Sequence, residues 1–167
     1  MIIVNEKLCD ESQVNFIEGL SFGRGLFETI LVKEEPIFLS EHVERINAGL
    51  IKIGINRHIT NEYVRENIVK LHCKNCALKM IVTNNNITFT KREISYTKKQ
   101  YGDGFSLLIS DNRRNKYSSL TYLKSINYLD NILEREKTLK AGYDEALFLN
   151  TDDEICEGSV SNIFFVK

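Results

Sequence analysis

The spacing of apolar residues along the 167-residue chain predicts two kinds of element. Short runs rich in β-branched and aromatic residues, bounded by turn residues, indicate strands. These runs cover residues 2–4, 26–32, 37–39, 78–83, 87–90, 105–110, 145–149, 154–158 and 162–166. Asn5 suits the turn of a first hairpin, and the asparagines of 84–86 suit the turn of a second one with left-handed backbone angles. The polar stretch 10–19 predicts a loop.

Apolar positions spaced three and four residues apart predict three helices. Ser40 is the expected N-cap of the first helix, which runs to Gly54, and Thr60 is the expected N-cap of the second. The third helix spans 129–139 and ends at Gly142. The expected apolar faces are Val43, Ile46, Ala48, Leu50 and Ile51 in the first helix, Tyr63, Val64, Ile68 and Leu71 in the second, and Leu129, Ile132, Leu133, Glu136 and Leu139 in the third.

The order of these elements indicates the fold class. Strands come in blocks between the helices, which favours an α+β architecture over a doubly wound parallel sheet. The last run, 163–166, is apolar without alternation, as in a strand that is buried on both faces. Because complete domains normally cover an apolar edge, we expect either a longer protein of which this is the front part, or a partner subunit over this strand.

Composition and charge narrow the function classes. The chain carries 22 Lys and Arg against 23 Asp and Glu, a net charge of −1, so nucleic acid is not an expected partner. No run of about 18 apolar residues could span a membrane. The N-terminus has no basic segment followed by a long apolar one, so we expect a cytoplasmic protein without a secretory signal.

One cysteine pair has the spacing of a metal knuckle. Cys73 and Cys76 are separated by Lys74 and Asn75, and His72 precedes them. A structural zinc site usually takes four ligands, commonly from two such pairs, and the sequence has no second pair. We therefore expect reduced thiols near the end of a helix and no metal.

Two segments carry candidate chemistry. Lys124 lies where a loop enters the third helix, between the apolar residues Leu123 and Ile126. An apolar setting lowers the pKa of a lysine, which suits Schiff-base chemistry, although most lysines are simply solvated. In the second segment, Glu157 ends a strand immediately before a bend of small residues at 158–161.

Five ordered motifs together resemble the class IV aminotransferase family, the fold-type IV pyridoxal-phosphate enzymes. The motifs are FGRGLFET at 22–29, FLSEHVERI at 38–46, LKSINYL at 123–129, GYDEAL at 142–147 and EGSVSNIF at 157–164. This family includes branched-chain and D-amino-acid aminotransferases and 4-amino-4-deoxychorismate lyase. The resemblance implies a fold with an N-terminal α/β sandwich at 1–115 and the first part of a cofactor-binding domain at 116–167.

The resemblance also implies a role for each matched residue. Lys124 would hold pyridoxal 5'-phosphate covalently and move the substrate proton. Glu157 would face the pyridine nitrogen, where a carboxylate keeps that nitrogen protonated. Arg45 would bind the cofactor phosphate with its guanidinium fork. Tyr128 falls where some members place a phenol near the ring oxygen.

The substrate site matches the family less well. Asn84 to Asn86 and Lys91 to Glu93 stand where lyase-like members carry a glycine-rich segment that ends in Arg-Gly-Tyr. The resemblance makes Arg92 and Tyr96 the remnant of that substrate site. The family's glycine-containing phosphate-binding turn comes after the last motif matched here, so we expect the 167-residue chain alone to bind the cofactor poorly.

The resulting expectation is an enzyme of amino-acid-like substrates. The compact spacing of 124–127 favours 4-amino-4-deoxychorismate lyase, which forms 4-aminobenzoate and pyruvate for folate synthesis. An amino-acid transaminase, of the branched-chain or D-amino-acid kind, is one alternative. A non-catalytic fragment is another. In each case the resemblance implies a homodimer.

Overall fold

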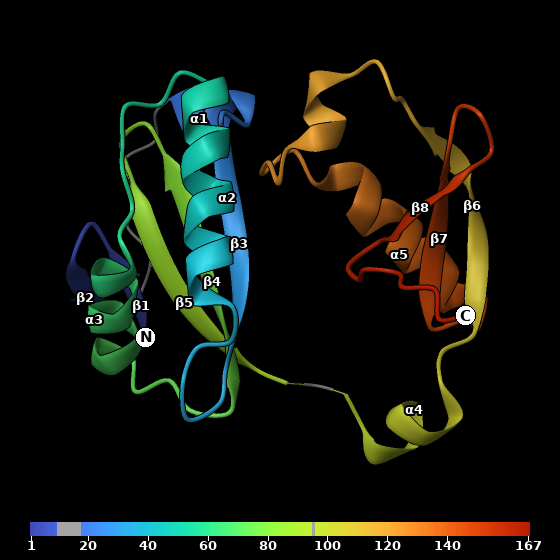
Figure 1. Ribbon diagram of the computed structural model, residues 1–167, viewed down its shortest axis with the longest axis horizontal. Coiled ribbons are helices and arrows are strands. Elements are labelled where there is room, and N and C mark those ends of the chain that lie inside the picture. Colours follow the sequence, from blue (N-terminus) through green and yellow to red (C-terminus); the bar gives the residue numbers. More distant parts are fainter. Residues whose placement is uncertain (10–17, 95) are drawn as a thin grey trace. The chain divides into compact units, whose positions relative to one another are not determined.

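The protein consists of two compact units. A computed structural model describes residues 1–9, 18–94 and 96–167. Unit 1 comprises Met1–Ser95 together with Leu123–Ile126, and unit 2 comprises Tyr96–Tyr122 together with Asn127–Lys167. Each unit combines helices with a sheet (Figure 1), so the expected α+β class is confirmed. We describe each unit by itself.

Unit 1 is built on a five-stranded sheet. Its strands are β1 (Ile2–Val4), β2 (Lys7–Cys9), β3 (Gly25–Val32), β4 (Cys76–Thr83) and β5 (Ile87–Glu93). They pair antiparallel in the order β2-β1-β5-β4-β3, which makes β3 an edge strand. Asn5 and Glu6 have φ of 46° and 72°, so the first hairpin turns at Asn5 as expected.

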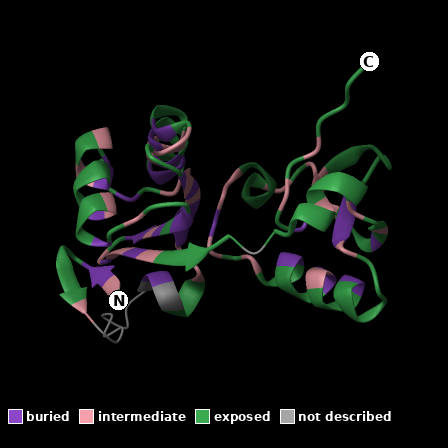
Figure 2. Ribbon diagram, turned by 90° about the horizontal axis from the view of Figure 1, so that it is seen from below, coloured by how far each residue is buried: buried purple, intermediate pink, exposed green. Residues whose placement is uncertain are grey.

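Two helices, α2 (Leu39–Lys52) and α3 (Asn61–Lys70), cover one face of this sheet (Figures 1 and 2). Alternate residues of β3 and β4 point toward them, because successive side chains of a strand lie on opposite faces. The core that results includes Leu26, Ile30, Val43, Ile46, Leu50, Val64, Leu71, Leu78, Met80 and Phe89. Two expected members of the α2 stripe, Ala48 and Ile51, are exposed instead.

The entry into α2 differs from the expectation. Residues 37–39 do not form a return strand, because Phe38 adopts a left-handed backbone with φ 52° and the helix begins at Leu39. Phe38, without a side-chain cap, is the N-cap in place of Ser40. Leu39 is buried in the core, so tertiary packing rather than capping chemistry sets where this helix starts.

The second helix and the second hairpin follow the sequence more closely. Thr60 caps α3, since its hydroxyl accepts a hydrogen bond from the Tyr63 amide at 3.1 Å. The turn between β4 and β5 lies at 84–86, but its asparagines have no positive φ. The turn is closed instead by Thr83 and Asn86, whose amides donate to Asn86 O and to Thr83 Oγ1.

Unit 2 is a smaller sheet with helices. Its strands β6 (Leu107–Arg114), β7 (Glu145–Asn150) and β8 (Ile155–Gly158) lie in the order β6-β7-β8, parallel between β6 and β7 and antiparallel between β7 and β8. The helices are α4 (Lys98–Asp103), the 3₁₀ helix η1 (Ser119–Tyr122) and α5 (Leu129–Lys140). The sequence did not predict α4, nor the short α1 (Glu18–Phe22) at the end of the expected loop 10–19; residues 10–17 lie outside the described ones.

Helix α5 packs with its polar side inward. Its buried residues are Asn131, Glu134 and Thr138, whereas Leu129, Ile132, Leu133 and Leu139 are each about half exposed or more (Figure 2). The predicted helix is therefore confirmed, but the predicted apolar core face is wrong. The physical reason is hydrogen bonding: Glu134 accepts from Ser110 Oγ at 2.8 Å and from Asn112 Nδ2 at 2.9 Å, and these bonds hold that side against β6.

The last predicted strand is also wrong. Residues 162–166 form no strand, and Phe164, Phe165 and Val166 are exposed rather than buried on both faces. The compact units divide after Ser95 and around Leu123–Ile126, whereas the expected domains are 1–115 and 116–167. The domain boundary itself stays a prediction.

Candidate active site

The Lys124 segment is attached to the edge strand of unit 1. Residues Leu123–Ile126 run beside β3, with a bridge between Leu26 and Ser125. The Phe27 amide donates to Lys124 O at 2.9 Å, and the Ile126 amide donates to Gly25 O at 3.0 Å. A Cβ at Gly25 would lie 3.0 Å from Ile126 Cδ1 and 2.9 Å from a methyl of Thr83. Glycine at this position therefore permits the close approach of the lysine segment.

The amine of Lys124 lies over an aromatic ring. Its Nζ is 4.7 Å from the centroid of the buried Phe27 ring, within the range of a cation–π interaction. Lys79 on β4 lies over the same ring at 4.9 Å. Burial, together with the charge of Arg92, lowers the pKa of Lys79. Phe27 thus has two amines beside it, of which the sequence pointed only to Lys124.

Arg45 is anchored by a buried carboxylate. From α2 its Nε donates to Glu28 Oε1 at 2.6 Å and its Nη2 donates to Glu28 Oε2 at 2.5 Å. His42, one turn earlier, lies 2.8 Å from the same Oε2. The Glu28 side chain is 1% exposed, whereas that of Arg45 is 55% exposed. The guanidinium is therefore tied to the sheet at one edge and open to solvent elsewhere.

In unit 2, Glu157 and Tyr128 belong to one local cluster. Glu157 Oε1 lies 3.0 Å from Arg114 Nε, and the Arg114 guanidinium stacks 3.7 Å over the Phe148 ring. The Tyr128 hydroxyl donates to Ser159 O at 2.7 Å, in the bend that follows Glu157. Burial, followed by the negative charge of Glu157, raises the pKa of the Tyr128 phenol. The structure thus brings these two expected cofactor residues together.

A second buried carboxylate fixes that bend. Glu145 accepts hydrogen bonds from the Ser159 amide at 3.1 Å, from the Ser159 hydroxyl and from the Val160 amide at 3.4 Å. A Cβ at Gly158 would lie 2.2 Å from Ser161 Oγ, so the bend needs glycine there. These contacts explain why small residues follow Glu157, and they hold the strand end that carries its carboxylate.

The two expected substrate residues lie in different units. Arg92 is exposed on β5 of unit 1, on the sheet face opposite to α2 and α3. Tyr96 belongs to unit 2, where its ring packs 6.5 Å from that of Tyr101 and 5.9 Å from that of Phe105. Each therefore has a local environment, and their joint role in a substrate site stays a prediction.

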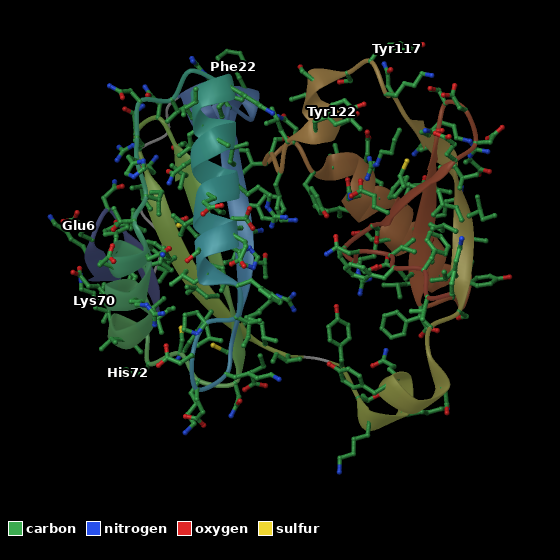
Figure 3. All side chains as sticks on the ribbon, viewed as in Figure 1. Glu6, Phe22, Lys70, His72, Tyr117 and Tyr122 are labelled. Carbon is green, nitrogen blue, oxygen red and sulfur yellow. The ribbon has the colours of Figure 1, made fainter. Side chains whose placement is uncertain are left out.

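The cysteine pair lies in the turn between α3 and β4. His72 and Asn75 have φ of 50° and 48°, and this turn places Cys76 at the start of β4 (His72 is labelled in Figure 3). Burial and a hydrogen bond with Cys76 raise the pKa of the Cys73 thiol to about 12. Among the residues that the structure describes, no group of three metal-ligating side chains occurs.

The sequence reasoning missed Glu28, Arg114 and Lys79. Glu28 could have been found from alternation, because Leu26, Ile30 and Val32 on the same strand face are all apolar core residues. A carboxylate at such a position needs a cationic partner, and Arg45 is that partner. No comparable local pattern marks Arg114 or Lys79, whose contacts arise from strand pairing.

The residues present fit pyridoxal phosphate. A half-buried lysine amine beside an aromatic ring suits covalent attachment, and an oriented, half-exposed guanidinium suits a phosphate. A carboxylate with a cationic neighbour stays ionised, which suits contact with a protonated pyridine nitrogen. The donor set therefore agrees with this group, although the structure itself contains no ligand.

Comparisons with known proteins point the same way. A family model described as amino-transferase class IV matches residues 25–167. A Methanocaldococcus jannaschii protein named as a branched-chain-amino-acid aminotransferase is 27% identical over 187 residues, and the match covers 99% of this chain and 65% of that protein. Aminodeoxychorismate lyase of Bacillus subtilis is 25% identical over 193 residues and is matched over 64% of its length.

A solved structure shares the fold. The branched-chain amino acid aminotransferase of T.th., complexed with N-(5'-phosphopyridoxyl)-L-glutamate, superposes with a TM-score of 0.81 at 21% identity and is covered over 63% of its chain. The present chain thus spans less than two thirds of these relatives. None of the helices described here has the length and apolar content to cross a membrane. The family uses pyridoxal phosphate, and this chain, matched by the family model over 25–167, belongs to the class IV aminotransferases.

Proposed function

We propose that the protein carrying this chain is a pyridoxal-phosphate enzyme that acts at the α-carbon of an amino-acid-like substrate, and specifically a 4-amino-4-deoxychorismate lyase. The observation that carries the proposal is the placement of Lys124, whose backbone is hydrogen bonded to β3 and whose amine lies over Phe27. An amine held in this way has a fixed position and a reduced contact with water. Both properties suit a residue that binds a carbonyl cofactor.

Lys124 then has two duties. Its amine attaches the cofactor, and once released it accepts and returns the proton at the substrate α-carbon. A proton-transfer group must lie within hydrogen-bond reach of the proton it moves. The two backbone hydrogen bonds to Gly25 and Phe27 give the segment the rigidity that such reach requires.

Arg45 and Glu157 hold the two charged ends of the cofactor. The half-exposed guanidinium of Arg45 binds the phosphate, and the carboxylate of Glu157 meets the protonated pyridine nitrogen. When bound, the cofactor supplies an electron sink for the charge that develops at the α-carbon. Tyr128 lies in the same cluster as Glu157 and contacts the ring oxygen in this proposal.

The lyase is preferred to an amino-acid transaminase for one reason in the sequence. The segment Lys124 to Asn127 is compact, as in lyase and D-amino-acid members. Arg92 and Tyr96 contribute to the substrate site in this proposal. The proposal further comprises a homodimer in the cytoplasm that serves folate synthesis.

Borohydride reduction tests the role of Lys124. With pyridoxal phosphate present, reduction should fix the cofactor to the peptide that contains Lys124, and Lys124→Ala should lose both the label and turnover. Lys79→Ala is the matched control, because Lys79 lies over the same ring at 4.9 Å. A label on Lys79, or on no lysine, would contradict the assignment, and the second result would favour a non-catalytic fragment.

Product analysis distinguishes the two reactions. A lyase converts 4-amino-4-deoxychorismate to 4-aminobenzoate and pyruvate without an amino acceptor. A transaminase needs a 2-oxo acid and releases a new amino acid. Pyruvate formation that depends on an added 2-oxo acid would overturn the lyase proposal and leave the cofactor assignment intact.

A further inference from the structure

We propose that Glu28 and His42 are positioning residues that hold the Arg45 guanidinium in one orientation for a phosphate group. This inference rests on the proposed function, since the phosphate in question is that of the cofactor. No motif of substrate chemistry assigns either residue, and neither faces the Lys124 amine along the strand, because Glu28 and Phe27 point to opposite faces of β3.

The geometry at Glu28 is saturated. Oε1 accepts from Arg45 Nε at 2.6 Å, and Oε2 accepts from Arg45 Nη2 at 2.5 Å and contacts His42 Nδ1 at 2.8 Å. The two bonds to Arg45 form a bidentate pair, which fixes both the position and the plane of a guanidinium. A lysine in place of Arg45 could not be fixed in this way.

The contacts of His42 determine its tautomer. An ionised carboxylate only accepts hydrogen bonds, so the Nδ1 of His42 must carry the hydrogen that lies toward Glu28 Oε2. The 3.3 Å approach of Arg45 Nη2 to the same Nδ1 is then a contact between two donors. His42 therefore supports Glu28 rather than Arg45 directly, and it closes the second oxygen to rotation.

The charge balance shows why Glu28 is ionised in a buried place. Burial by itself raises the pKa of this carboxyl, but hydrogen bonds and charges from Arg45 and His42 outweigh burial, and the net pKa is lowered. A buried ion pair is a weak source of stability compared with apolar packing. Its site between Leu26 and Ile30 would accept an apolar residue, so orientation of Arg45 is the better reason for a carboxylate there.

The orientation leaves Arg45 able to bind an anion. A guanidinium has five N–H donors, and Glu28 takes two of them, so the remaining donors point away from the carboxylate. The side chain is 55% exposed, so a phosphate can reach them. Glu28 thus fixes one edge of the fork while the other edge receives the ligand.

The test compares ligands that differ only in the phosphate. Binding of pyridoxal phosphate and of pyridoxal is measured by absorbance for wild type, Glu28→Gln, His42→Leu and His42→Asn. We expect Glu28→Gln to lower the preference for the phosphorylated ligand by about tenfold, the scale of one hydrogen bond to a charged group. His42→Leu should lower it less, and His42→Asn, which can donate a hydrogen in the same place, should restore it.

A matched control and a spectroscopic readout complete the test. Glu35→Gln removes the carboxylate of an exposed pair with Arg65, also at 2.5 Å, and should change nothing. The Arg45 Nε–H signal in ¹⁵N NMR, identified by its loss in Arg45→Lys, should be present in wild type and Glu35→Gln and absent in Glu28→Gln. Circular dichroism confirms folding of each variant.

The outcomes separate this inference from the proposed function. An unchanged ligand preference in a folded Glu28→Gln overturns the positioning role. If Glu28→Gln does not fold, equal preferences in His42→Leu and wild type overturn it. If wild type shows no preference for phosphate, the proposed function fails, and the positioning role is then judged by the Nε–H signal, whose persistence in Glu28→Gln or in His42→Leu refutes it.

Discussion

At the scale of single residues, Glu28 makes unit 1 sensitive to acid. Its folded-state pKa is lowered from 4.5 by Arg45 and His42 against the opposing effect of burial. A carboxyl with a lowered folded pKa binds protons more readily when unfolded, so it stabilises the fold above about pH 4.5. That contribution is lost as the pH falls through the folded pKa.

We therefore expect the free energy of unfolding of wild type to fall more steeply below about pH 4.5 than that of Glu28→Gln. Urea titrations at a series of pH values between neutrality and strong acid measure both. Glu35→Gln, which removes an exposed carboxylate, serves as the reference and should keep the wild-type slope. Equal slopes in wild type and Glu28→Gln would rule out Glu28 as a source of acid sensitivity.

Single residues also show how far sequence reasoning reached. Lys124 and Glu157 were found because the resemblance rests on ordered motifs around them. Glu28 lies inside the same motifs, yet its role depends on a side chain 17 positions away, in another element. A partner across that separation is set by the packing of α2 on β3, which motif reading does not supply.

At the scale of elements, helix starts separate local from tertiary causes. Thr60 caps α3 through its hydroxyl, while the start of α2 is set at Phe38 without a side-chain cap. The two residues Ser40 and Thr60 look alike in the sequence, because each precedes an amphipathic stretch. Only the first was wrong, and the difference is that Leu39 is drawn into the core.

We expect Thr60→Ala to lower the free energy of unfolding of unit 1 by about 1 kcal/mol, the usual cost of losing an N-cap. Ser40→Ala should cost less than about 0.5 kcal/mol, since its hydroxyl only accepts an exposed bond from Asn61 at 3.0 Å. Chemical denaturation of both variants measures the difference. Equal costs would show that Ser40 acts as a cap after all.

Helix α5 gives the opposite lesson. Its period of apolar residues predicted the helix, but the side that packs on the sheet is polar. Periodicity identifies a helix and an apolar stripe, but not which surface the stripe meets. In unit 2 the hydrogen bonds of Glu134 and Asn131 decide the contact.

We expect Glu134→Ala to destabilise unit 2 by about 1–3 kcal/mol, because it leaves Ser110 and Asn112 without their buried acceptor. Leu133→Ala, at a half-exposed position of the same helix, should cost less than about 1 kcal/mol. Thermal and urea denaturation of the two variants compare them. A larger loss for Leu133→Ala would mean that the apolar stripe is buried in the protein in solution.

At the scale of the whole molecule, the two units differ in how much apolar surface they bury. The contiguous apolar core lies entirely in unit 1, whereas the buried hydrophobic residues of unit 2 are Ala146, Leu147 and Phe148 among those described. Stability is correspondingly uneven, since local opening follows the density of buried apolar contacts.

Hydrogen exchange should reveal this difference. We expect amides of β3 and β4 to keep their protection to higher denaturant than those of β6 and β7. Mass spectrometry of peptides from the four strands, at increasing urea, measures the order. Simultaneous loss of protection in all four strands would show that the units unfold as one.

The class of the fold followed from the sequence because helices and strands are local periodic patterns. The placement of residues 123–126 did not, because this short segment leaves its sequence neighbours in unit 2 and joins the edge of the sheet in unit 1. No local pattern encodes such an exchange, which depends on the small size of Gly25.

Strand β3 has four consecutive residues that serve two different anchors. Gly25, Leu26 and Phe27 hold the lysine segment, and Glu28 holds Arg45 on the other face. A point substitution can damage one anchor and spare the other. Inserting or deleting a single residue within this stretch would instead turn every later side chain to the wrong face, bringing an aromatic ring where the carboxylate belongs. The length of this stretch is thus under tighter constraint than its composition, and both anchors would be lost in one event.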